Sequence, residues 1–308
     1  MKVIHNFSSN KHYTKIPLTD ILIWICGLYS LKVYDNTIKL YCKESDIAFL
    51  KKYGIYYLYD EIDTSFLESF VPPVDETNFW SIRKLACIEN EFMVSKEPFV
   101  YMDTDIILNI PLDCPSDVLV WGLEPTEGVY IPLDMLSIPD NYEIPDWLAA
   151  TNNAYNCGIL SFKSKEFFEL YLKEYYKFTI NNPCIIKSDF NFFDIERRAI
   201  WACNAEQRIL KGLIDYYDLE PTAITVDPHH HYSESGIHYY ILRNNWRKLN
   251  INSESLTEEQ IEIIQGQLNT TIFSCLGMLP DAHRQLLLDK IPEFKDFWEK
   301  DIRLTKYI

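Results

Sequence analysis

Two aspartates that stand two residues apart, Asp103 and Asp105, interrupt the apolar run from Phe99 to Leu108. Burying an unpaired carboxylate costs several kcal/mol, so a strand inside the core should not carry both. We therefore expect a strand that leaves the core at Met102 and delivers the two acids to an opening. The alternative is a pair of acids on a solvated turn.

Two carboxylates at this spacing could hold one hard cation. Alternate strand residues lie about 7 Å apart at a rise of ~3.3 Å per residue, and a bend at the strand end can bring their oxygens together. Mg²⁺ and Mn²⁺ prefer oxygen ligands and keep coordination positions open for phosphate oxygens. Asp103 and Asp105 therefore indicate a metal ion that in turn binds a phosphate-containing ligand.

The chain before these acids alternates strands and helices. Strands are expected over residues 3–7, 38–42 and 56–59, and helices over about 20–34, 46–53 and 78–93. Such alternation favours a parallel sheet with crossover helices on its faces. Ligands of these sheets bind at the carboxyl ends of the strands, which is where Asp103 and Asp105 fall on the fourth strand.

The second half of the chain alternates less regularly. We expect strands over 118–121, 157–162, 223–226 and 238–241, and helices over 165–179, about 192–213, 257–268 and from 281 onward. Three prolines between residues 131 and 147 indicate a long loop that could flank a site. We expect one domain over residues 1–250 and a helical C-terminal extension packed on it over 251–308.

The composition limits the partners. The chain has 308 residues and a formal net charge of −16. This charge disfavours nucleic acid as a partner, because a nucleic-acid backbone needs a basic face, but a nucleotide needs only one or two cations and a metal. The eight cysteines form no Cys-x-x-Cys pair and several lie in apolar runs. They favour core thiols in a reducing compartment, and hence a cytoplasmic protein.

The longest apolar stretch runs from Ile21 to Leu31. It is too short to span a bilayer, so we expect no transmembrane segment here. A signal-peptide core is one alternative, but Asp20 abuts the stretch and a strand-like segment precedes it. The stretch predicts a buried first crossover helix.

The segment Trp80–Ala86, followed by Phe99–Ile106, resembles the core of GT-A-fold glycosyltransferases of the glycogenin and lipopolysaccharide-galactosyltransferase type. These enzymes transfer sugars from nucleotide-diphosphate donors. The resemblance implies a GT-A-like, Rossmann-type α/β fold with a mostly parallel sheet flanked by helices. It also implies that Asp103 and Asp105 bind a divalent ion on the donor diphosphate, and that Arg83 or Lys84 lies near the donor.

Three later segments extend the resemblance in family order. Ala154–Leu160 is similar to the family strand whose Asn, here Asn156, faces the transferred sugar. Ala205–Leu210 is similar to the helix segment whose acid contacts sugar hydroxyls and whose amide lies below the reacting carbon, here Glu206 and Gln207. Ile237–Trp246 resembles the closing element that supplies a third metal ligand, here His238, and a basic residue for the diphosphate, here Arg243.

What the resemblance implies is a metal-dependent hexosyltransferase-like enzyme with Mn²⁺ or Mg²⁺. The donor would be a nucleotide-diphosphate sugar such as a UDP-sugar, the acceptor a hydroxyl of a glycan, lipid-linked molecule or protein, and the outcome retention. Negative charge grows on the leaving diphosphate, where a metal and an Arg or Lys would stabilise it. Gln207 or Glu206 could stabilise the cation-like donor carbon.

Two other functions stay open. The first is a sugar- or nucleotide-binding module that has lost turnover, because Glu206 and Arg208 replace the two family aspartates and Tyr239 replaces the glycine after His238. The second is a phosphatase of the haloacid dehalogenase type, which also ends a strand with Asp-x-Asp. That family has Thr or Val at the position of Ile107 and usually places its motif on the first strand, whereas three strands precede the motif here.

Other residues have a functional and a plainer interpretation. The run His229–His231 could bind a transition metal, but a solvated loop after Pro228 is the simpler explanation. Trp121, Trp147 and Tyr155 could stack against a sugar acceptor, although aromatic residues are abundant here and most should lie in the core.

Overall fold

The computed structural model of the chain describes residues 1–8, 18–113, 116–125, 132–151, 153–186, 197–225, 232–233 and 236–238, and further on 257, 263, 266, 270, 272–292, 294–295 and 298. At residues 18, 125, 197–199, 232–233 and 236–238 it describes the backbone alone.

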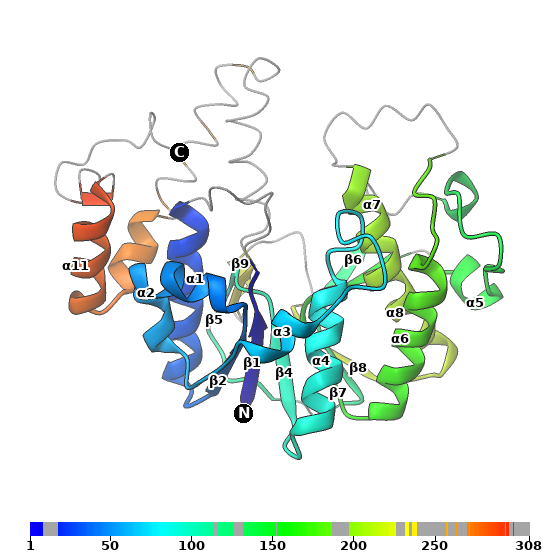
Figure 1. The fold of residues 1–308 in the computed structure, drawn as a ribbon, viewed down its shortest axis with the longest axis horizontal. Helices are drawn as coiled ribbons and strands as arrows, with labels where there is room; N and C mark the ends of the chain where they lie inside the picture. Colours follow the sequence, from blue (N-terminus) through cyan, green and yellow to red (C-terminus); the bar gives the residue numbers. More distant parts are fainter. Residues whose placement is uncertain are drawn as a thin grey trace. The chain divides into compact units, whose positions relative to one another are not determined.

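Most of the described strands belong to one mixed sheet (Figure 1). Its members are β1 (Lys2–Asn6), β2 (Thr37–Tyr41), β3 (Glu61–Asp63), β4 (Phe99–Met102), β6 (Val118–Pro125), β7 (Asn153–Phe162) and β8 (Pro221–Thr225). The strand order is β3-β2-β1-β4-β7-β6-β8. The pairs β1–β4, β2–β3 and β6–β8 are parallel, whereas β7 runs antiparallel to β4 and β6. The expected α/β class with a mostly parallel sheet and flanking helices is confirmed.

A second, three-stranded sheet has the order β5-β10-β9. It consists of β5 (Ile106–Leu108), β10 (Gly236–His238) and β9 (Tyr232–Ser233), and both of its pairs are antiparallel. The apolar run that holds the two aspartates is therefore split between two sheets.

Close contacts divide the chain into two compact units. The first unit comprises Met1–Asn6, Ser69–Met102 and Leu112–His230, and the second comprises Phe7–Glu68, Asp103–Pro111 and His231–Ile308. The predicted boundary at residue 250 stays a prediction, because residues 239–256 lie outside the described part of the chain.

The helices of the first unit are α4 (Ile82–Val94), α5 (Asp146–Ala149), α6 (Lys165–Thr179), α7 (Arg197–Cys203) and α8 (Ile209–Tyr216). A 3₁₀ turn at Leu133–Met135 and a π-helical turn at Asn204–Arg208 complete them. The helices α4, α6 and α8 pack side by side, α4 against β1, and α6 and α8 against β7 (Figure 1).

Helix α6 shows why this layer forms. Ser164 caps its start, with the Oγ accepting a hydrogen bond from the Phe167 backbone N–H at 3.1 Å. Phe168, Tyr171 and Tyr175 recur at helical spacing and are fully buried. Aromatic rings therefore make much of the core between α6 and β7, where Phe162 contacts two of these side chains.

The second unit contains α1 (Leu18–Val33), α2 (Ile47–Lys52), α3 (Ser65–Ser69) and α11 (Asp281–Lys290), with 3₁₀ turns at Glu44–Asp46 and Ile55–Leu58 and further helical residues at 272–278. The apolar stretch Ile21–Leu31 lies within α1 and is almost entirely buried, so the predicted buried helix is confirmed. None of the helices in the described residues has the length and apolar composition that spanning a membrane requires.

Two predicted elements were wrong. Residues 56–59 were expected as a strand, but Ile55–Leu58 forms a 3₁₀ turn and the third strand is β3 at Glu61–Asp63. A short aromatic run has no periodicity that separates strand from helix, and Gly54, with φ of 74°, starts the turn. The continuous helix expected over 192–213 is interrupted by the π-helical turn, and residues 192–196 lie outside the described part.

Candidate functional site

The two aspartates lie on the turn that joins β4 to β5. Strand β4 ends at Met102, as expected from the sequence, and β5 begins at Ile106. Asp105 is only 8% exposed, whereas Asp103 is more open. A fully solvated turn therefore does not describe Asp105.

Helix α1 fixes the backbone that follows Asp105. The Leu108 N–H donates to Ser30 Oγ at 3.0 Å, and that hydroxyl donates to the Gly27 carbonyl at 2.7 Å. Gly27 has no side chain because the Ile106 carbonyl oxygen occupies the space that a Cβ would need. The position of β5, and with it Asp105, therefore depends on a close approach between a helix and a strand.

The backbone of His238 lies beside the same strand. In the antiparallel pair of β5 and β10, His238 is in register with Ile106, the residue directly after Asp105. His238, the predicted third ligand, thus lies on β10, which pairs with β5, the strand directly after Asp105. Among the side chains that the structure describes, which do not include that of His238, no three His, Cys, Asp or Glu groups cluster closely enough to hold a metal.

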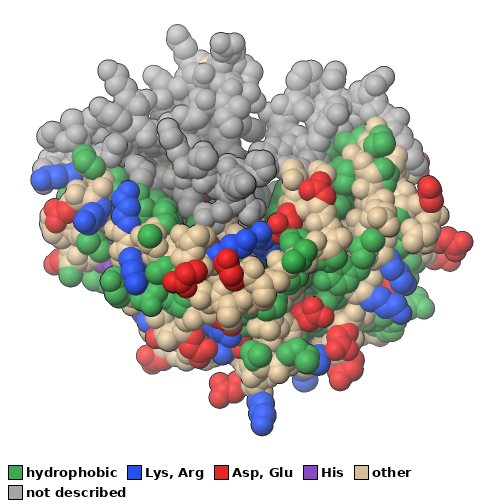
Figure 2. All heavy atoms as spheres, in the orientation of Figure 1, with side chains coloured by type: hydrophobic (Ala, Val, Ile, Leu, Met, Phe, Trp, Pro, Cys, Tyr) green, Lys and Arg blue, Asp and Glu red, His purple; other side chains and the backbone are tan. Residues whose placement is uncertain are grey.

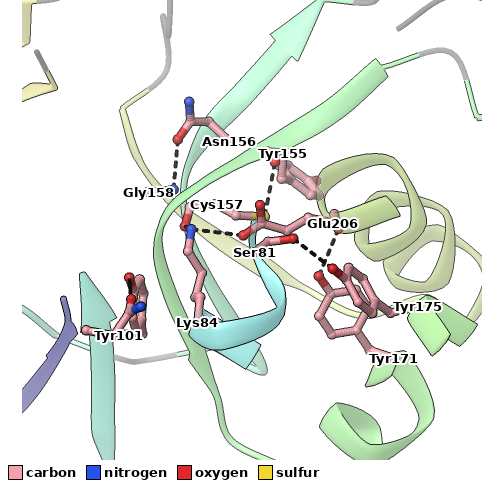
Figure 3. A network of polar contacts seen from close by, with 11 residues as sticks. Ser81, Lys84, Tyr101, Tyr155, Asn156, Cys157, Gly158, Tyr171, Tyr175 and Glu206 are labelled. Carbon is pink, nitrogen blue, oxygen red and sulfur yellow. Dashed lines mark hydrogen bonds and ion pairs between the residues drawn. The ribbon is translucent and has the colours of Figure 1, made fainter. Parts of the chain in front are cut away.

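Lys84 and Glu206 form a buried ion pair in the first unit (Figure 3). The Lys84 Nζ lies 2.9 Å from the Glu206 Oε1, and the two side chains are 10% and 4% exposed. The same ammonium donates to the Cys157 carbonyl at 2.9 Å and lies 5.1 Å from the centre of the Tyr101 ring. Lys84 therefore binds groups of its own unit. The sequence had instead suggested that it binds the donor.

Three buried hydroxyl groups lie near this ion pair, and one of them binds the Glu206 backbone (Figure 3). The Tyr171 hydroxyl donates to the Glu206 backbone carbonyl at 2.9 Å, and the hydroxyls of Ser81 and Tyr175 lie 3.1 Å apart (Figure 3). Burial, followed by the nearby Cys157 and Glu206, raises the pKa of Tyr171 well above its ordinary value. The Tyr171 phenol stays neutral and acts as a hydrogen-bond donor.

Glu206 and Gln207 lie on the π-helical turn Asn204–Arg208. Gln207 is partly exposed, while Glu206 and Arg208 on either side are buried. Isolated π-turns are rare and recur at functional sites, since the extra residue re-aims side chains. Gln207 is therefore more accessible than the residues directly before and after it on the turn.

Arg208 binds other groups of the protein. Its Nη2 donates to the Thr151 carbonyl at 2.9 Å, and its Nη1 lies 3.3 Å from the Asn204 Oδ1. Burial lowers the pKa of Arg208. The guanidinium holds the loop after α5 against the π-helical turn.

Arg83 lies next to Lys84 on α4 but has different partners. Its Nε and Nη2 both donate to the carboxylate of Glu76, the second at 2.9 Å. Its Nη1 is buried and has no hydrogen-bond partner among the described residues. An unsatisfied buried guanidinium nitrogen needs an explanation, and a bound anion would supply one.

Asn156 lies on β7, and its amide is bound at both ends. The Gly158 N–H donates to the Asn156 Oδ1 at 2.9 Å, and the Asn156 Nδ2 donates to the Glu124 Oε1 at 2.5 Å. Glu124 was missed by the sequence reasoning, which ended its strand at residue 121. Strand β6 continues to Pro125, so an acid at a strand end, the signal that singled out Asp103, would have found it.

The remaining predicted residues are fully or partly buried, or lie outside the described residues. Trp121 is 2% exposed and belongs to the core, so it does not stack against an acceptor. Trp147 lies on α5 against Gly212, where a Cβ would meet its ring at 2.7 Å. Tyr155 is 9% exposed, and Lys211 lies over its ring. Arg243 and the run His229–His231 lie outside the described residues.

Comparison with known proteins gives no sequence relative. No protein-family model matches the chain, and no curated protein matches it. Among solved structures, the galactosyltransferase LgtC with donor and acceptor sugar analogues matches at 10% identity and a TM-score of 0.34, covering 67% of this chain and 71% of that one. An active-site mutant of LgtC matches at 8% identity and a TM-score of 0.34, covering 67% and 70%.

The PaToxG glycosyltransferase matches at 11% identity and a TM-score of 0.38, covering 88% of this chain and 84% of that one. These three structures are all of glycosyltransferases. Their identities and TM-scores are too low to assign an activity to this chain, so its function has to be argued from its own residues.

Proposed function

We propose that this chain is a metal-dependent glycosyltransferase that moves a sugar from a nucleotide-diphosphate donor to a hydroxyl acceptor. The observation that carries the proposal is the arrangement of the aspartate turn. Strand β4 ends directly before Asp103, Asp105 is largely buried, and β10 brings the backbone of His238 into register with the next residue.

The donor set suits Mn²⁺ or Mg²⁺. The carboxylates of Asp103 and Asp105 are hard oxygen ligands, and the imidazole of His238 would add a nitrogen that Mn²⁺ accepts more readily than Mg²⁺ does. When bound, the ion would neutralise charge on the donor diphosphate. A chain with a net charge of −16 needs such a cation to attract an anionic donor.

Arg83 is the second cationic group that we assign to the donor. Its Nη1 is buried without a described partner, while its other nitrogens are held by Glu76. This hold fixes the plane of the guanidinium, so one N–H edge stays available for a phosphate oxygen. The matching role for Arg243 rests on the resemblance alone, and the role of Lys84 is to hold Glu206.

Three residues of the first unit are assigned to the donor sugar. Glu206 would accept hydrogen bonds from sugar hydroxyls while it stays paired with Lys84, and Asn156 would contact the transferred sugar. Gln207 is the partly exposed member of the π-helical turn, and its amide oxygen could stabilise the donor carbon as positive charge grows there. A UDP donor, a glycan, lipid-linked or protein acceptor, and retention are further parts of this proposal.

The deciding experiment incubates the chain with a panel of nucleotide sugars and Mn²⁺ and measures nucleoside diphosphate release. We expect Asp105→Asn and removal of the metal by a chelator each to lower the rate at least about a hundredfold, as expected when a metal's charge stabilisation is lost. Glu97→Gln, which changes an exposed carboxylate outside the site, should leave the rate unchanged. Release that survives both treatments would contradict the proposal.

A binding module without turnover is the second candidate. Arg208 favours it, because this buried cation replaces a family acid and binds only groups of the protein in the contacts described above. Tight nucleotide binding with no release from any donor would support the module. Phosphate release from phosphomonoesters without any sugar donor would instead indicate a phosphatase.

A further inference from the structure

Strand β7 carries a bulge directly beside Asn156. Val120 of β6 pairs with Leu160, and Gly122 pairs with Asn156, so two steps along β6 span the same length as four steps along β7. The register between β6 and β7 therefore shifts at Cys157 and Gly158. Bulges of this kind re-aim side chains and are common next to active sites.

Side chains of the candidate site satisfy the backbone of this bulge. The Cys157 carbonyl accepts the bond from Lys84 at 2.9 Å, and the Gly158 N–H donates to the Asn156 Oδ1 at 2.9 Å. Figure 3 shows the Asn156 oxygen directed at Gly158 and its nitrogen on the opposite end. The amide oxygen of Asn156 therefore already accepts a hydrogen bond within the protein.

Glu124 fixes the other end of the same amide. The Asn156 Nδ2 donates to the Glu124 Oε1 at 2.5 Å. Turning the amide over would place its NH₂ against the Gly158 N–H and its oxygen against the Glu124 carboxylate. Both contacts would be repulsive, so only one orientation is compatible with its neighbours.

Glu124 lies close enough to the Lys84–Glu206 pair to act on the same thiol, that of Cys203. Burial raises the pKa of the Cys203 thiol well above its ordinary value, and the charges of Glu124 and then Glu206 raise it further, while Lys84 acts in the opposite sense. Cys203 immediately precedes the π-helical turn. The carboxylate of Glu124 therefore lies near the residues assigned to the donor sugar.

We propose that Glu124 is the positioning residue of this site, and that it makes Asn156 a hydrogen-bond donor to the substrate. With its oxygen committed to Gly158, Asn156 offers the second Nδ2 proton, which suits a hydroxyl or ether oxygen of a sugar. The inference rests on the proposed function for the identity of the ligand, but the amide orientation stands on the contacts alone.

The first test is spectroscopic and independent of activity. In protein labelled with ¹⁵N-asparagine, the side-chain NH₂ signal of Asn156, identified by its loss in Asn156→Asp, should show one strongly deshielded, exchange-protected proton. Glu124→Ala should abolish this signature, and Glu124→Gln, whose amide oxygen can still accept the bond, should retain part of it. An Asn156 signal that is unchanged in Glu124→Ala would overturn the pairing.

The second test is kinetic and separates a positioning role from a direct one. We expect Glu124→Ala to lower kcat about tenfold or more in the wild-type background but less than about twofold in an Asn156→Ala background, since coupled residues act through one contact. Glu124→Gln should recover most of the rate, and Glu97→Ala, an exposed control, should match the wild type. An equal loss in both backgrounds would overturn the proposal.

The two tests also separate this inference from the proposed function. If the wild-type chain turns over no donor while the amide signature depends on Glu124, the proposed activity fails and the orientation of Asn156 holds. If the chain is active and the signature is absent, the inference fails and the activity holds.

Discussion

Lys84 shows what residue-level reasoning could and could not predict. The sequence marked Arg83 and Lys84 together as donor-binding candidates. Neighbours on a helix point about 100° apart at 3.6 residues per turn, so both cannot face one ligand in the same way. The structure assigns Lys84 to Glu206 and Cys157, and leaves Arg83 with a buried nitrogen that has no described partner. Which of two adjacent cations turns inward depends on packing that the sequence does not contain.

Removing one partner of the Lys84–Glu206 pair should destabilise the protein strongly. We expect Glu206→Gln to lower the unfolding free energy by about 3–5 kcal/mol, because it leaves the Lys84 ammonium buried without its counter-charge. Asp60→Asn breaks the more exposed Lys32–Asp60 pair and should cost only about 0–1 kcal/mol. Urea unfolding of the two variants measures this difference. Equal losses would mean that the buried pair is no more important to folding than the surface pair.

At the scale of elements, the regular alternation of the first hundred residues was predictable and the irregular features were not. The strand before the aspartates, its end at Met102 and the buried helix α1 are confirmed. The π-helical turn at Asn204–Arg208 was missed because its hydrophobic spacing reads as an ordinary helix. The bulge in β7 was missed because Asn156-Cys157-Gly158 was interpreted as a regular strand, although a glycine inside a strand is a signal for a bulge.

The close approach of α1 to β5 gives a prediction at the same scale. We expect Gly27→Ala to destabilise the protein by about 1–3 kcal/mol, because the new methyl group would collide with the Ile106 carbonyl. The displaced strand carries Asp105 at its start, so Mn²⁺ binding should weaken as well. Unfolding by urea and Mn²⁺ titration by calorimetry measure the two effects.

Gly277 is the matched control for that substitution. It lies among the helical residues 272–278, and a Cβ there would meet no atom within 4 Å. Gly277→Ala should therefore stabilise the protein by roughly 0.5–1 kcal/mol, since it reduces the freedom of the unfolded chain. A destabilisation equal to that of Gly27→Ala would show that the collision with Ile106 is not the cause.

At the scale of the whole molecule, charge was predictable from composition but its placement was not. The net charge of −16 correctly indicated an acidic protein. Figure 2 shows acidic and basic side chains interspersed over the described surface of one face, with hydrophobic side chains between them. The sequence could not show that cations such as Lys84 and Arg208 are buried inside the fold. Fewer basic side chains are therefore exposed on the surface.

Buried histidine makes the stability of the molecule depend on pH. His5 on β1 is 1% exposed, and burial lowers its pKa to about 3 from an ordinary value of 6.5. Between these values the unfolded chain binds a proton that the folded chain does not. The unfolding free energy should therefore be unaffected by His5 above pH 6.5 and should fall as the pH drops from 6.5 toward 3, by up to about 1.4 kcal/mol per pH unit.

The variant His5→Leu isolates this contribution. Its unfolding free energy should fall less steeply than that of the wild type between pH 6 and pH 4, whatever its absolute stability, when urea unfolding is followed across that range. Carboxylates such as Asp63, whose pKa is lowered, contribute equally to both proteins. Parallel curves would mean that His5 is not a neutral buried imidazole.

The passage of the chain back and forth between the two compact units has a consequence for synthesis on the ribosome. The second unit draws on Phe7–Glu68, Asp103–Pro111 and His231–Ile308, so its last part is made after the whole of the first unit. Strand β5 emerges with Asp105 long before β10, the strand that pairs with it. The nascent chain must therefore keep β5 unpaired until its C-terminal part has emerged. A ribosome-bound intermediate would hold the aspartate turn before the strand of His238 exists, so the metal binding that we propose should be among the last properties that the protein acquires.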